Sequence, residues 1–284
     1  MDMIRTTEAL TFQDFLRYPA LRVEEGEFAF VTGRSGAGKS TYLLLLVVLV
    51  VMRVCRIDQT RLLVVSSMKM TVQLILAGLI LTYIFEHPHP LFVVAYLGAM
   101  TGFSIHRVLS KNRDLNPRFR LVTGVSIAGA GLCVLAYFVA VVVGEGLFNP
   151  QYVIPIGGMV MGNTMTGVSL GVKTFRESIH DQRSKIEALV CVGASAEDIL
   201  LPFVRQALET AMLPTLNSMV GMGIVSLPGM MTGQILAGTL PMTSILYQIA
   251  IMIAICTAVT CACFGTLYFG SKTLYDKKRQ IIQL

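Results

Sequence analysis

Charged residues are scarce in this chain. Only 14% of its 284 residues are Asp, Glu, Lys or Arg, whereas 54% are hydrophobic. Soluble domains carry about 25% charged residues, so this composition excludes an ordinary soluble protein for most of the chain. The mean hydropathy of +0.67 leads to the same conclusion. At about 20 residues for each crossing, the length allows six or seven membrane-spanning helices.

The excess of positive charge does not indicate a nucleic-acid partner. The formal net charge is +6, but the Lys and Arg residues lie in short stretches between apolar runs, and no basic stripe is interleaved with aromatic residues. Such a distribution is what the positive-inside rule predicts for cytoplasmic loops. We therefore expect a multi-pass protein of the cell membrane, in contact with membrane lipid and without bound nucleic acid.

Paired cysteines are also missing. The six cysteines include no C-x-x-C pair, which argues against a zinc ribbon and gives no sign of a disulfide framework. The segment Glu86-His-Pro-His89 could gather a divalent cation, although a lone segment of this kind is more often an ordinary loop. The metal-binding residues of the chain, if it has any, are therefore unknown at this stage.

Beyond residue 41, apolar runs alternate with short polar loops. The expected spans cover residues 42–54, 62–85, 91–109, 121–144, 152–172, 206–227 and 242–270. The first of them is short for a bilayer crossing. Basic loops alternate with loops that lack Lys and Arg, and this alternation places residues 173–205 and the C-terminus in the cytoplasm.

Residues 1–41 differ in kind from the rest. An apolar run, Phe28-Ala-Phe-Val31, precedes Gly33-Arg-Ser-Gly-Ala-Gly-Lys-Ser40, a full match to the phosphate-loop pattern G-x-x-x-x-G-K-[ST]. In such a loop backbone N–H groups cradle the phosphates, the lysine reaches the β and γ oxygens, and the hydroxyl ligates Mg²⁺. The candidate nucleotide-binding residues are Gly33, Gly36, Gly38, Lys39, Ser40 and Thr41. This opening resembles the start of an ABC-type ATPase, so we expect a short α/β-like fragment over residues 1–41.

The remaining parts of an ATPase are absent from the sequence. No Walker B aspartate follows an apolar strand, no signature loop of the Leu-Ser-Gly-Gly-Gln kind occurs, and the chain continues from Tyr42 as an apolar run. We interpret the motif as a vestigial fragment joined to a transmembrane permease domain of residues 42–284. The alternative is a membrane-anchored P-loop nucleotide-binding protein, which would need the missing motifs.

The charged interval contains a second motif. The segment Lys185-Ile-Glu-Ala-Leu-Val-Cys-Val-Gly-Ala-Ser195 has the form E-A-x-x-x-x-G-A-S. It resembles the coupling helix of ABC permeases, where a glycine turn lets a short helix dock into a groove on a separate ATPase. The candidate coupling residues are Glu187, Ala188, Gly193 and Ala194, on a helix expected over residues 185–201. An ordinary solvated helix is the alternative.

With this motif, residues 42–284 resemble the FetB-like permeases (uncharacterised-permease family 0014), which include a bacterial iron exporter and plant aluminium-tolerance proteins. The segments that carry the resemblance are Val153–Met159, Gly162–Asn163, Glu187–Ala188, Gly193–Ala194, Pro214–Thr215 and Ser226–Gln234. The resemblance implies an all-α, polytopic permease that exports metal ions as a homodimer. It also implies that a separate ABC ATPase subunit hydrolyses the ATP, so the chain itself is no enzyme and binds no cofactor. A secondary transporter without an ATPase remains an alternative, but it has no use for a coupling helix.

A few polar residues lie inside the two signature spans. Asn163, Thr164, Asn217 and Ser218 are the candidate transport-pathway residues, because polar groups at membrane depth tend to face a bundle interior or a pathway. Hydrogen bonding between helices explains them equally well. Methionines gather around them, either as ligands for a soft ion or, more simply, as adaptable packing residues.

Small and charged residues in the same spans allow two local predictions. Gly157, Gly158, Gly162 and Gly167 are expected to let helices approach closely. Glu209 follows Arg205 by four residues, which predicts a local ion pair on one helix.

The purified chain is expected not to hydrolyse ATP, because residues 33–41 lack the remaining parts of an ATPase. The measurement is phosphate release by the purified protein beside its Lys39→Ala variant. An activity that disappears in the variant would contradict the interpretation of a vestigial motif.

Overall fold

The computed structural model describes residues 4–5, 10–12, 16–18, 22–23, 39–55, 60–87, 89–112 and 115–275. The chain divides into two compact units, Met1–Ile80 and Leu81–Leu284. The division expected between residues 41 and 42 stays a prediction.

The first unit opens with two pairs of short strands. β1 (Ile4–Arg5) pairs antiparallel with β4 (Arg22–Val23), and β2 (Leu10–Phe12) pairs antiparallel with β3 (Leu16–Tyr18). The expected strand at residues 28–31 and the glycines Gly33, Gly36 and Gly38 lie outside the described residues. Lys39, Ser40 and Thr41 begin helix α1 (Lys39–Val54). The described residues thus do not assemble the α/β fragment that the sequence predicted.

Two apolar helices complete this part of the chain. α1 has 16 residues, which at about 1.5 Å per residue is about 24 Å, shorter than a hydrocarbon core of about 30 Å. α2 (Thr60–Glu86) has 27 residues and crosses the boundary between the two units. The most apolar part of α2 has no residue buried within the chain. Such all-round exposure of apolar side chains is expected where lipid replaces water around a helix.

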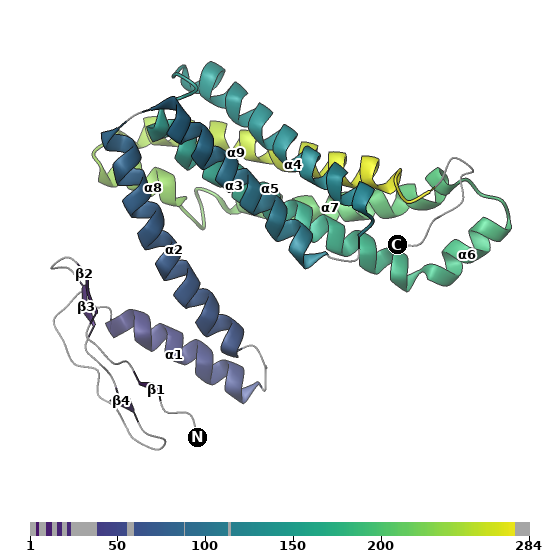
Figure 1. The fold of residues 1–284 in the computed structure, drawn as a ribbon, viewed down its shortest axis with the longest axis horizontal. Coiled ribbons are helices and arrows are strands. Elements are labelled where there is room, and N and C mark those ends of the chain that lie inside the picture. Colours follow the sequence, from purple (N-terminus) through teal and green to yellow (C-terminus); the bar gives the residue numbers. More distant parts are fainter. Residues whose placement is uncertain are drawn as a thin grey trace. The chain divides into compact units, whose positions relative to one another are not determined.

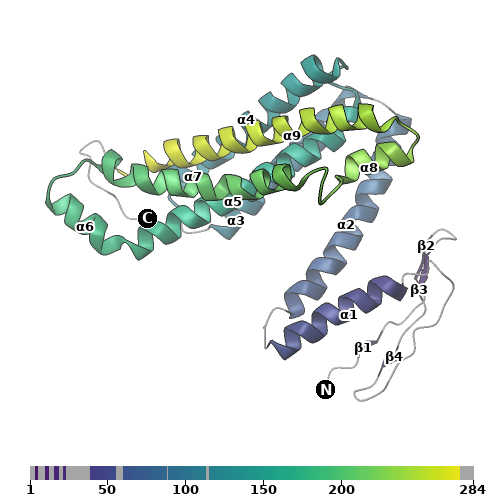
Figure 2. The same cartoon turned by 180° about the vertical axis from the view of Figure 1, so that it is seen from behind.

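The second unit is a helical bundle built around one helix, α5. Its long helices are α3 (Pro90–Lys111), α4 (Pro117–Tyr137), α5 (Pro150–Asp181), α7 (Ala196–Gly221) and α9 (Pro241–Phe264). α5 packs against the other four (Figures 1 and 2). The connections carry two short helices, α6 (Arg183–Cys191) and α8 (Gly229–Leu236). Two π-helical segments, η2 (Phe138–Val143) and η3 (Gly265–Phe269), continue α4 and α9.

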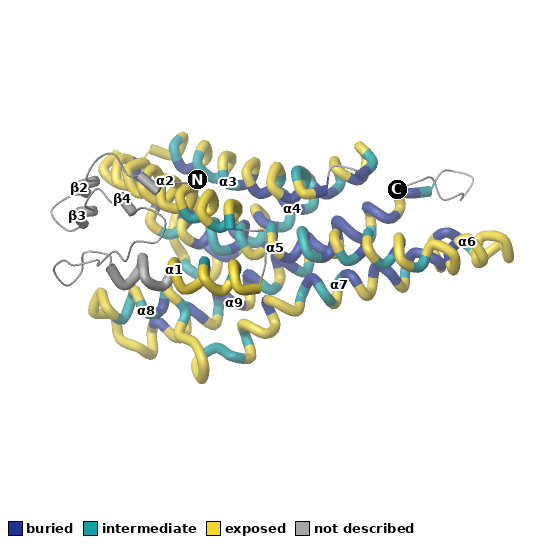
Figure 3. The backbone as a smooth tube through the Cα atoms, turned by 90° about the horizontal axis from the view of Figure 1, so that it is seen from below, coloured by how far each residue is buried: buried dark blue, intermediate teal, exposed yellow. Residues whose placement is uncertain are grey.

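Glycines allow α5 to approach its neighbours closely. A Cβ atom added to Gly167 would lie 2.7 Å from Cγ1 of Val259 in α9 and 3.4 Å from the backbone oxygen of Ala211 in α7. This part of α5 is correspondingly buried, as the tube in Figure 3 shows. The same test gives contacts of 3.0 to 3.2 Å at Gly157 and Gly158. Close approach is thus confirmed at these three glycines, whereas Gly162 has no atom within 4 Å.

Among the described residues, five helices are long and apolar enough to cross a membrane. They are Thr60–Glu86, Pro90–Lys111, Pro117–Val143, Pro150–Asp181 and Pro241–Phe269. Their bounds agree with five of the expected spans to within a few residues, except that α5 continues nine residues beyond the expected end at residue 172. At about 1.5 Å per residue, the 32 residues of α5 extend about 48 Å. This helix is therefore longer than the hydrocarbon core is thick.

The span expected at residues 206–227 differs most from the structure. α7 begins at Ala196, ends at Gly221 and contains Pro202 and Pro214. Its 26 residues are enough for a crossing, but charged and amide side chains along it keep its hydropathy below that of the five helices above. The six to seven spans that the sequence predicted are accordingly not confirmed.

Basic side chains gather at one end of the second unit, which we call the basic end. It is formed by the ends of α3 and α5, the starts of α4 and α7, and α6. The side chain of Arg176 in α5 donates a hydrogen bond of 3.4 Å to Oδ1 of Asn112 at the end of α3. The connections at residues 87–89, 144–149 and 222–240 contain no Lys or Arg. The positive-inside rule therefore predicts a cytoplasmic basic end.

Cysteine labelling from outside intact cells tests this orientation. One reporter keeps only the natural Cys191, which is exposed on α6, and a matched reporter carries only Leu147→Cys, at an exposed position of the opposite connection. A membrane-impermeant maleimide is expected to label the second reporter in intact cells and the first only after permeabilisation. The reverse pattern would refute the cytoplasmic assignment of the basic end.

A methyl group at Gly167 is expected to destabilise the bundle. Because the added carbon meets a branched valine and a backbone oxygen, Gly167→Ala should lower stability by about 1–3 kcal/mol, the usual effect of overpacking. Gly162→Ala is the matched control, since open space surrounds that position. The measurement is the temperature at which half of the detergent-solubilised protein is no longer monodisperse. Equal midpoints for the two variants would contradict the packing role of Gly167.

Candidate functional site

A short helix and a glycine turn join α5 to α7 at the basic end. α6 ends in a Schellman motif, in which Gly193 N–H donates to Val190 O and Ala194 N–H donates to Leu189 O, both at 3.0 Å. Gly193 has a φ of 85°, a left-handed conformation that glycine adopts without the steric penalty of a Cβ atom. The turn predicted at Gly193 is therefore present, directly after α6.

The helix expected over residues 185–201 is not continuous. α6 covers Arg183–Cys191, and residues 196–201 form the first turns of α7. Ser195 is the N-cap of α7 and accepts a hydrogen bond from the backbone N–H of Asp198. Glu197 and Asp198 add negative charge at the positive end of the helix dipole. The pattern Ser-x-x-Asp is a capping signal, and it would have located this helix start from sequence.

The surface of α6 combines charge with exposed apolar side chains. Nε of Arg183 donates to Oε1 of Glu187 at 2.9 Å, one helical turn away, and both side chains are exposed. Leu189, Val190 and Val192 are also exposed, Val192 at 86% of its surface. Ile186 is the one buried residue of this helix. α6 follows α5 beyond the span expected to end at residue 172. Its exposed apolar groups therefore lie outside the expected membrane region.

The four candidate pathway residues lie in different surroundings in the single chain. Asn163 is exposed, and its Nδ2 donates to Met159 O of its own helix at 2.8 Å. Thr164 is fully buried, and its hydroxyl has no hydrogen-bond partner among the described residues. Asn217 and Ser218 are exposed on α7, where the serine hydroxyl donates to Pro214 O. Asn163, Asn217 and Ser218 therefore remain available to a surface outside this chain.

The described residues show neither the cation site suggested at Glu86–His89 nor the ion pair predicted between Arg205 and Glu209. Within the described ranges no group of three or more His, Cys, Asp and Glu side chains is placed to hold a metal ion. Nδ1 of His89 instead accepts a hydrogen bond from Leu91 N–H and caps α3, and His87 stacks on Tyr83. The predicted pair of Arg205 and Glu209 is absent among the described ion pairs, although both side chains are exposed.

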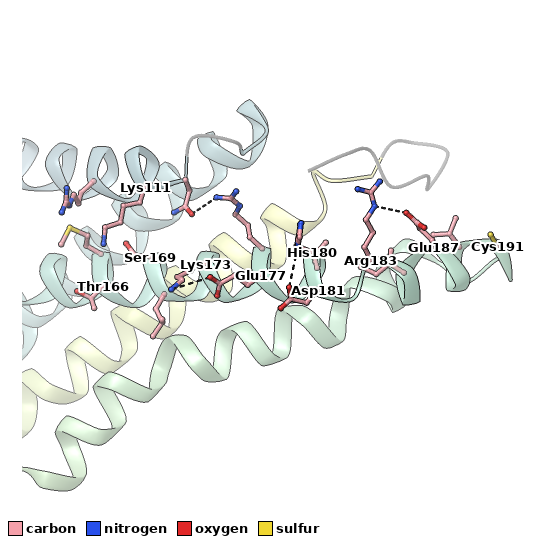
Figure 4. A pocket seen from close by; sticks show the side chains of 18 residues that line it. Lys111, Thr166, Ser169, Lys173, Glu177, His180, Asp181, Arg183, Glu187 and Cys191 are labelled. Carbon is pink, nitrogen blue, oxygen red and sulfur yellow. Dashed lines mark hydrogen bonds and ion pairs between the residues drawn. The ribbon is translucent and has the colours of Figure 1, made fainter. Parts of the chain in front are cut away.

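A cavity of about 1520 Å³ opens at the basic end, between α3, α5 and α6 (Figure 4). We call it the basic cavity. Its basic lining residues are Arg107, Lys111, Lys173, Arg176, His180 and Arg183. Thr166 and Ser169 line it deeper along α5, and the α6 residues Glu187 and Cys191 line it at the far end. Sequence reasoning missed this cavity because its walls come from α3 and α5, which are far apart in the chain.

An ion pair links the start of α7 to the residues that follow η3. Nζ of Lys272 lies 3.8 Å from Oε1 of Glu197 and 4.3 Å from the centre of the Tyr268 ring. A hydrogen bond to the Tyr268 side chain raises the pKa of Lys272, and attraction to Glu197 adds to the increase. The lysine therefore stays charged at neutral pH, and its contact joins the glycine turn region to η3.

The long apolar helices and the exposed connection between α5 and α7 define a multi-pass membrane protein. Residues 39–275 match the family described as "Uncharacterised protein family (UPF0014)". The chain belongs to this family. The match begins at Lys39, so the residues ahead of it, which include most of the phosphate-loop motif, take no part in it.

Relatives from bacteria and plants have informative names. The UPF0014 membrane protein slr1647 of Synechocystis sp. is 33% identical over 217 residues, which are 74% of this chain and 82% of that protein. Protein ALUMINUM SENSITIVE 3 of Arabidopsis thaliana is 30% identical over 210 residues, 74% of this chain and 76% of its own length. The "Probable iron export permease protein FetB" of Escherichia coli (strain K12) is 29% identical over 160 residues, 52% and 62% of the two chains. No solved structure matches the chain.

Proposed function

We propose that this protein is the membrane subunit of an ABC transporter and that a separate ATPase subunit hydrolyses the ATP. The observation that carries the proposal is α6 with its glycine turn. Exposed apolar residues beside an exposed ion pair are the surface that a helix-in-groove contact needs. Val192 supplies the most exposed apolar anchor, and Glu187 lies on the charged rim. Ala188 precedes Val192 and Ala194 follows it, and both alanines are small and exposed.

The cargo that we propose is a metal ion, moved out of the cytoplasm. Support comes from the name of FetB, which describes a probable iron export permease. The polar residues Asn163, Asn217 and Ser218 are the proposed pathway residues, because amide and hydroxyl oxygens at membrane depth can replace part of the hydration of an ion. Thr164, next to Asn163 on α5, is the buried member of this set, and its hydroxyl has no hydrogen-bond partner among the described residues.

We further propose that two copies assemble through the uncovered face of α5. Asn163, Thr166 and Lys173 are exposed along this face at intervals of three and seven residues, which keeps them on one side of a helix. Polar groups at membrane depth are costly beside lipid, so a covering protein surface is favoured. A homodimer would enclose Asn163 between its two subunits, where a pathway could run, whereas Thr166 and Lys173 line the basic cavity.

The phosphate-loop motif has no part in this proposal, and we regard residues 1–41 as a vestigial ATPase-like fragment. Two other functions compete with it. A membrane-anchored P-loop protein would bind nucleotide through Lys39, and an ATPase-independent carrier would transport its cargo without a partner. Transport that depends on a separate ATPase separates the main proposal from both.

Substitution of Gly193 tests the coupling role of the turn. Gly193→Val should abolish stimulation of the partner ATPase by the transported ion, because a β-branched residue is strongly disfavoured at a φ of 85°. Gly193→Asn is the matched control, since asparagine tolerates left-handed backbone and should retain most of the coupling. The measurement is metal-stimulated ATP hydrolysis by the reconstituted complex, with co-purification of the two subunits measured alongside.

A pathway variant provides the opposite pattern. Asn163→Leu should weaken the metal response while the ATPase remains bound.

Full transport by Gly193→Val, with the partner still attached, would leave the coupling assignment without support.

A further inference from the structure

We propose that the basic cavity binds the phosphate-bearing headgroup of an anionic phospholipid from the membrane leaflet at the basic end. This inference concerns the single chain and does not depend on the identity of the cargo or of the ATPase. The ligand chemistry is a phosphate group next to an apolar chain. A soluble phosphate compound offers the phosphate group without the apolar chain, and soluble probes distinguish it from a lipid.

Two of the three carboxylates that line the cavity are paired with a cation. Glu177 lies 3.7 Å from Lys173, and Glu187 lies 2.9 Å from Arg183. Asp181 lies 3.7 Å from Nδ1 of His180, which is charged only when it is protonated. Figure 4 shows these pairs along α5 and α6. The five Lys and Arg residues of the lining outnumber its three carboxylates, so the cavity keeps an excess of positive charge.

The wall formed by α3 carries two unpaired cations. Arg107 and Lys111 line the cavity from α3, and no ion pair joins either of them to a residue of the described parts of the chain. They are four residues apart, so they lie one above the other on the helix. Two like charges at this spacing repel each other. A phosphate between them would turn this repulsion into two charge-assisted hydrogen bonds.

The lining of the cavity changes along α5 from charged to polar to apolar, which is the order of groups in a phospholipid from its headgroup to its acyl chains. Lys173 lies at the basic end, the hydroxyls of Ser169 and Thr166 follow one and two turns deeper, and Met165 and Leu170 supply apolar lining. One helical turn is about 5.4 Å, so this series covers the passage from a headgroup to the start of the acyl chains. On α3 the exposed Phe103 precedes Arg107 by one turn and continues the apolar side.

Size and charge favour a phospholipid over simpler occupants. A volume of about 1520 Å³ exceeds the roughly 300–1,000 Å³ of ordinary small-molecule sites, and a free phosphate would leave most of it unfilled. A bare metal cation would be repelled by Arg107 and Lys111. Basic pockets between helices at a cytoplasmic membrane surface are the usual recognition sites for anionic headgroups.

The test uses the full-length protein, purified in detergent and incubated with equal amounts of phosphatidylglycerol and phosphatidylcholine of identical acyl chains. Native mass spectrometry then measures which lipid is retained. The double variant Arg107→Gln/Lys111→Gln removes the unpaired cations. The matched control is Arg118→Gln/Arg120→Gln, which removes two basic residues of α4 at the same end that do not line the cavity.

We expect wild-type protein to retain phosphatidylglycerol in preference to phosphatidylcholine. Loss of two cavity cations should reduce this preference about thirtyfold, which corresponds to about 1 kcal/mol of attraction for each basic residue, and the control should keep it. The charge-preserving swap Arg107→Lys/Lys111→Arg should also keep it, which separates loss of charge from a general loss of folding.

Two results would overturn the proposal. The first is an equal reduction in the cavity variant and the control, which would indicate unspecific attraction to the basic end. The second comes from soluble probes. If glycerol phosphate or inorganic phosphate raises the thermal midpoint of the wild-type protein as much as the lipid does, the cavity belongs to a soluble anion.

Discussion

Lipid offers α5 no hydrophobic driving force for packing against its neighbours, and this constraint shapes the second unit. Since lipid tails are as apolar as leucine, helices in a membrane associate through close contact and through hydrogen bonds. At Gly167 the missing side chain brings α5 within van der Waals distance of both α7 and α9. The bundle therefore depends on small residues at the centre and tolerates large exposed apolar residues at its periphery.

The same helix that organises the membrane part also supplies a wall of the basic cavity. Because α5 continues without a break to Asp181, Lys173 and Arg176 are held by the helix that packs the core. α6 and the Gly193 turn follow at once and lead into α7, which packs on α5 again. A partner that binds α6 would thus contact a segment covalently tied to the two central helices.

Sequence reasoning located the apolar helices well, because continuous hydrophobicity over about 20 residues is characteristic of a membrane-spanning helix. It also found the turn at Gly193. It placed the start of α7 too late in the chain, since Ser195, the last residue of the coupling-like motif, is also an N-cap. Arg107 and Lys111 counted only as loop charges, and the wall that they form with α5 depends on contacts between distant segments. The phosphate-loop motif was the strongest local pattern in the chain, yet it lies mostly outside both the family match and the described residues.

α7 contains two interior prolines, whereas α5 contains one, Pro155, and α3, α4 and α9 contain none beyond the first turn. Each proline lacks the N–H that would bond to the carbonyl four residues earlier, so the backbone ladder is interrupted near Pro202 and again near Pro214. The interruptions are twelve residues apart, about 18 Å along the axis. α9 contains no proline beyond its first turn. α7 therefore lacks backbone hydrogen bonds that α9 keeps, so a force applied at the Gly193 turn should bend α7 more easily than α9.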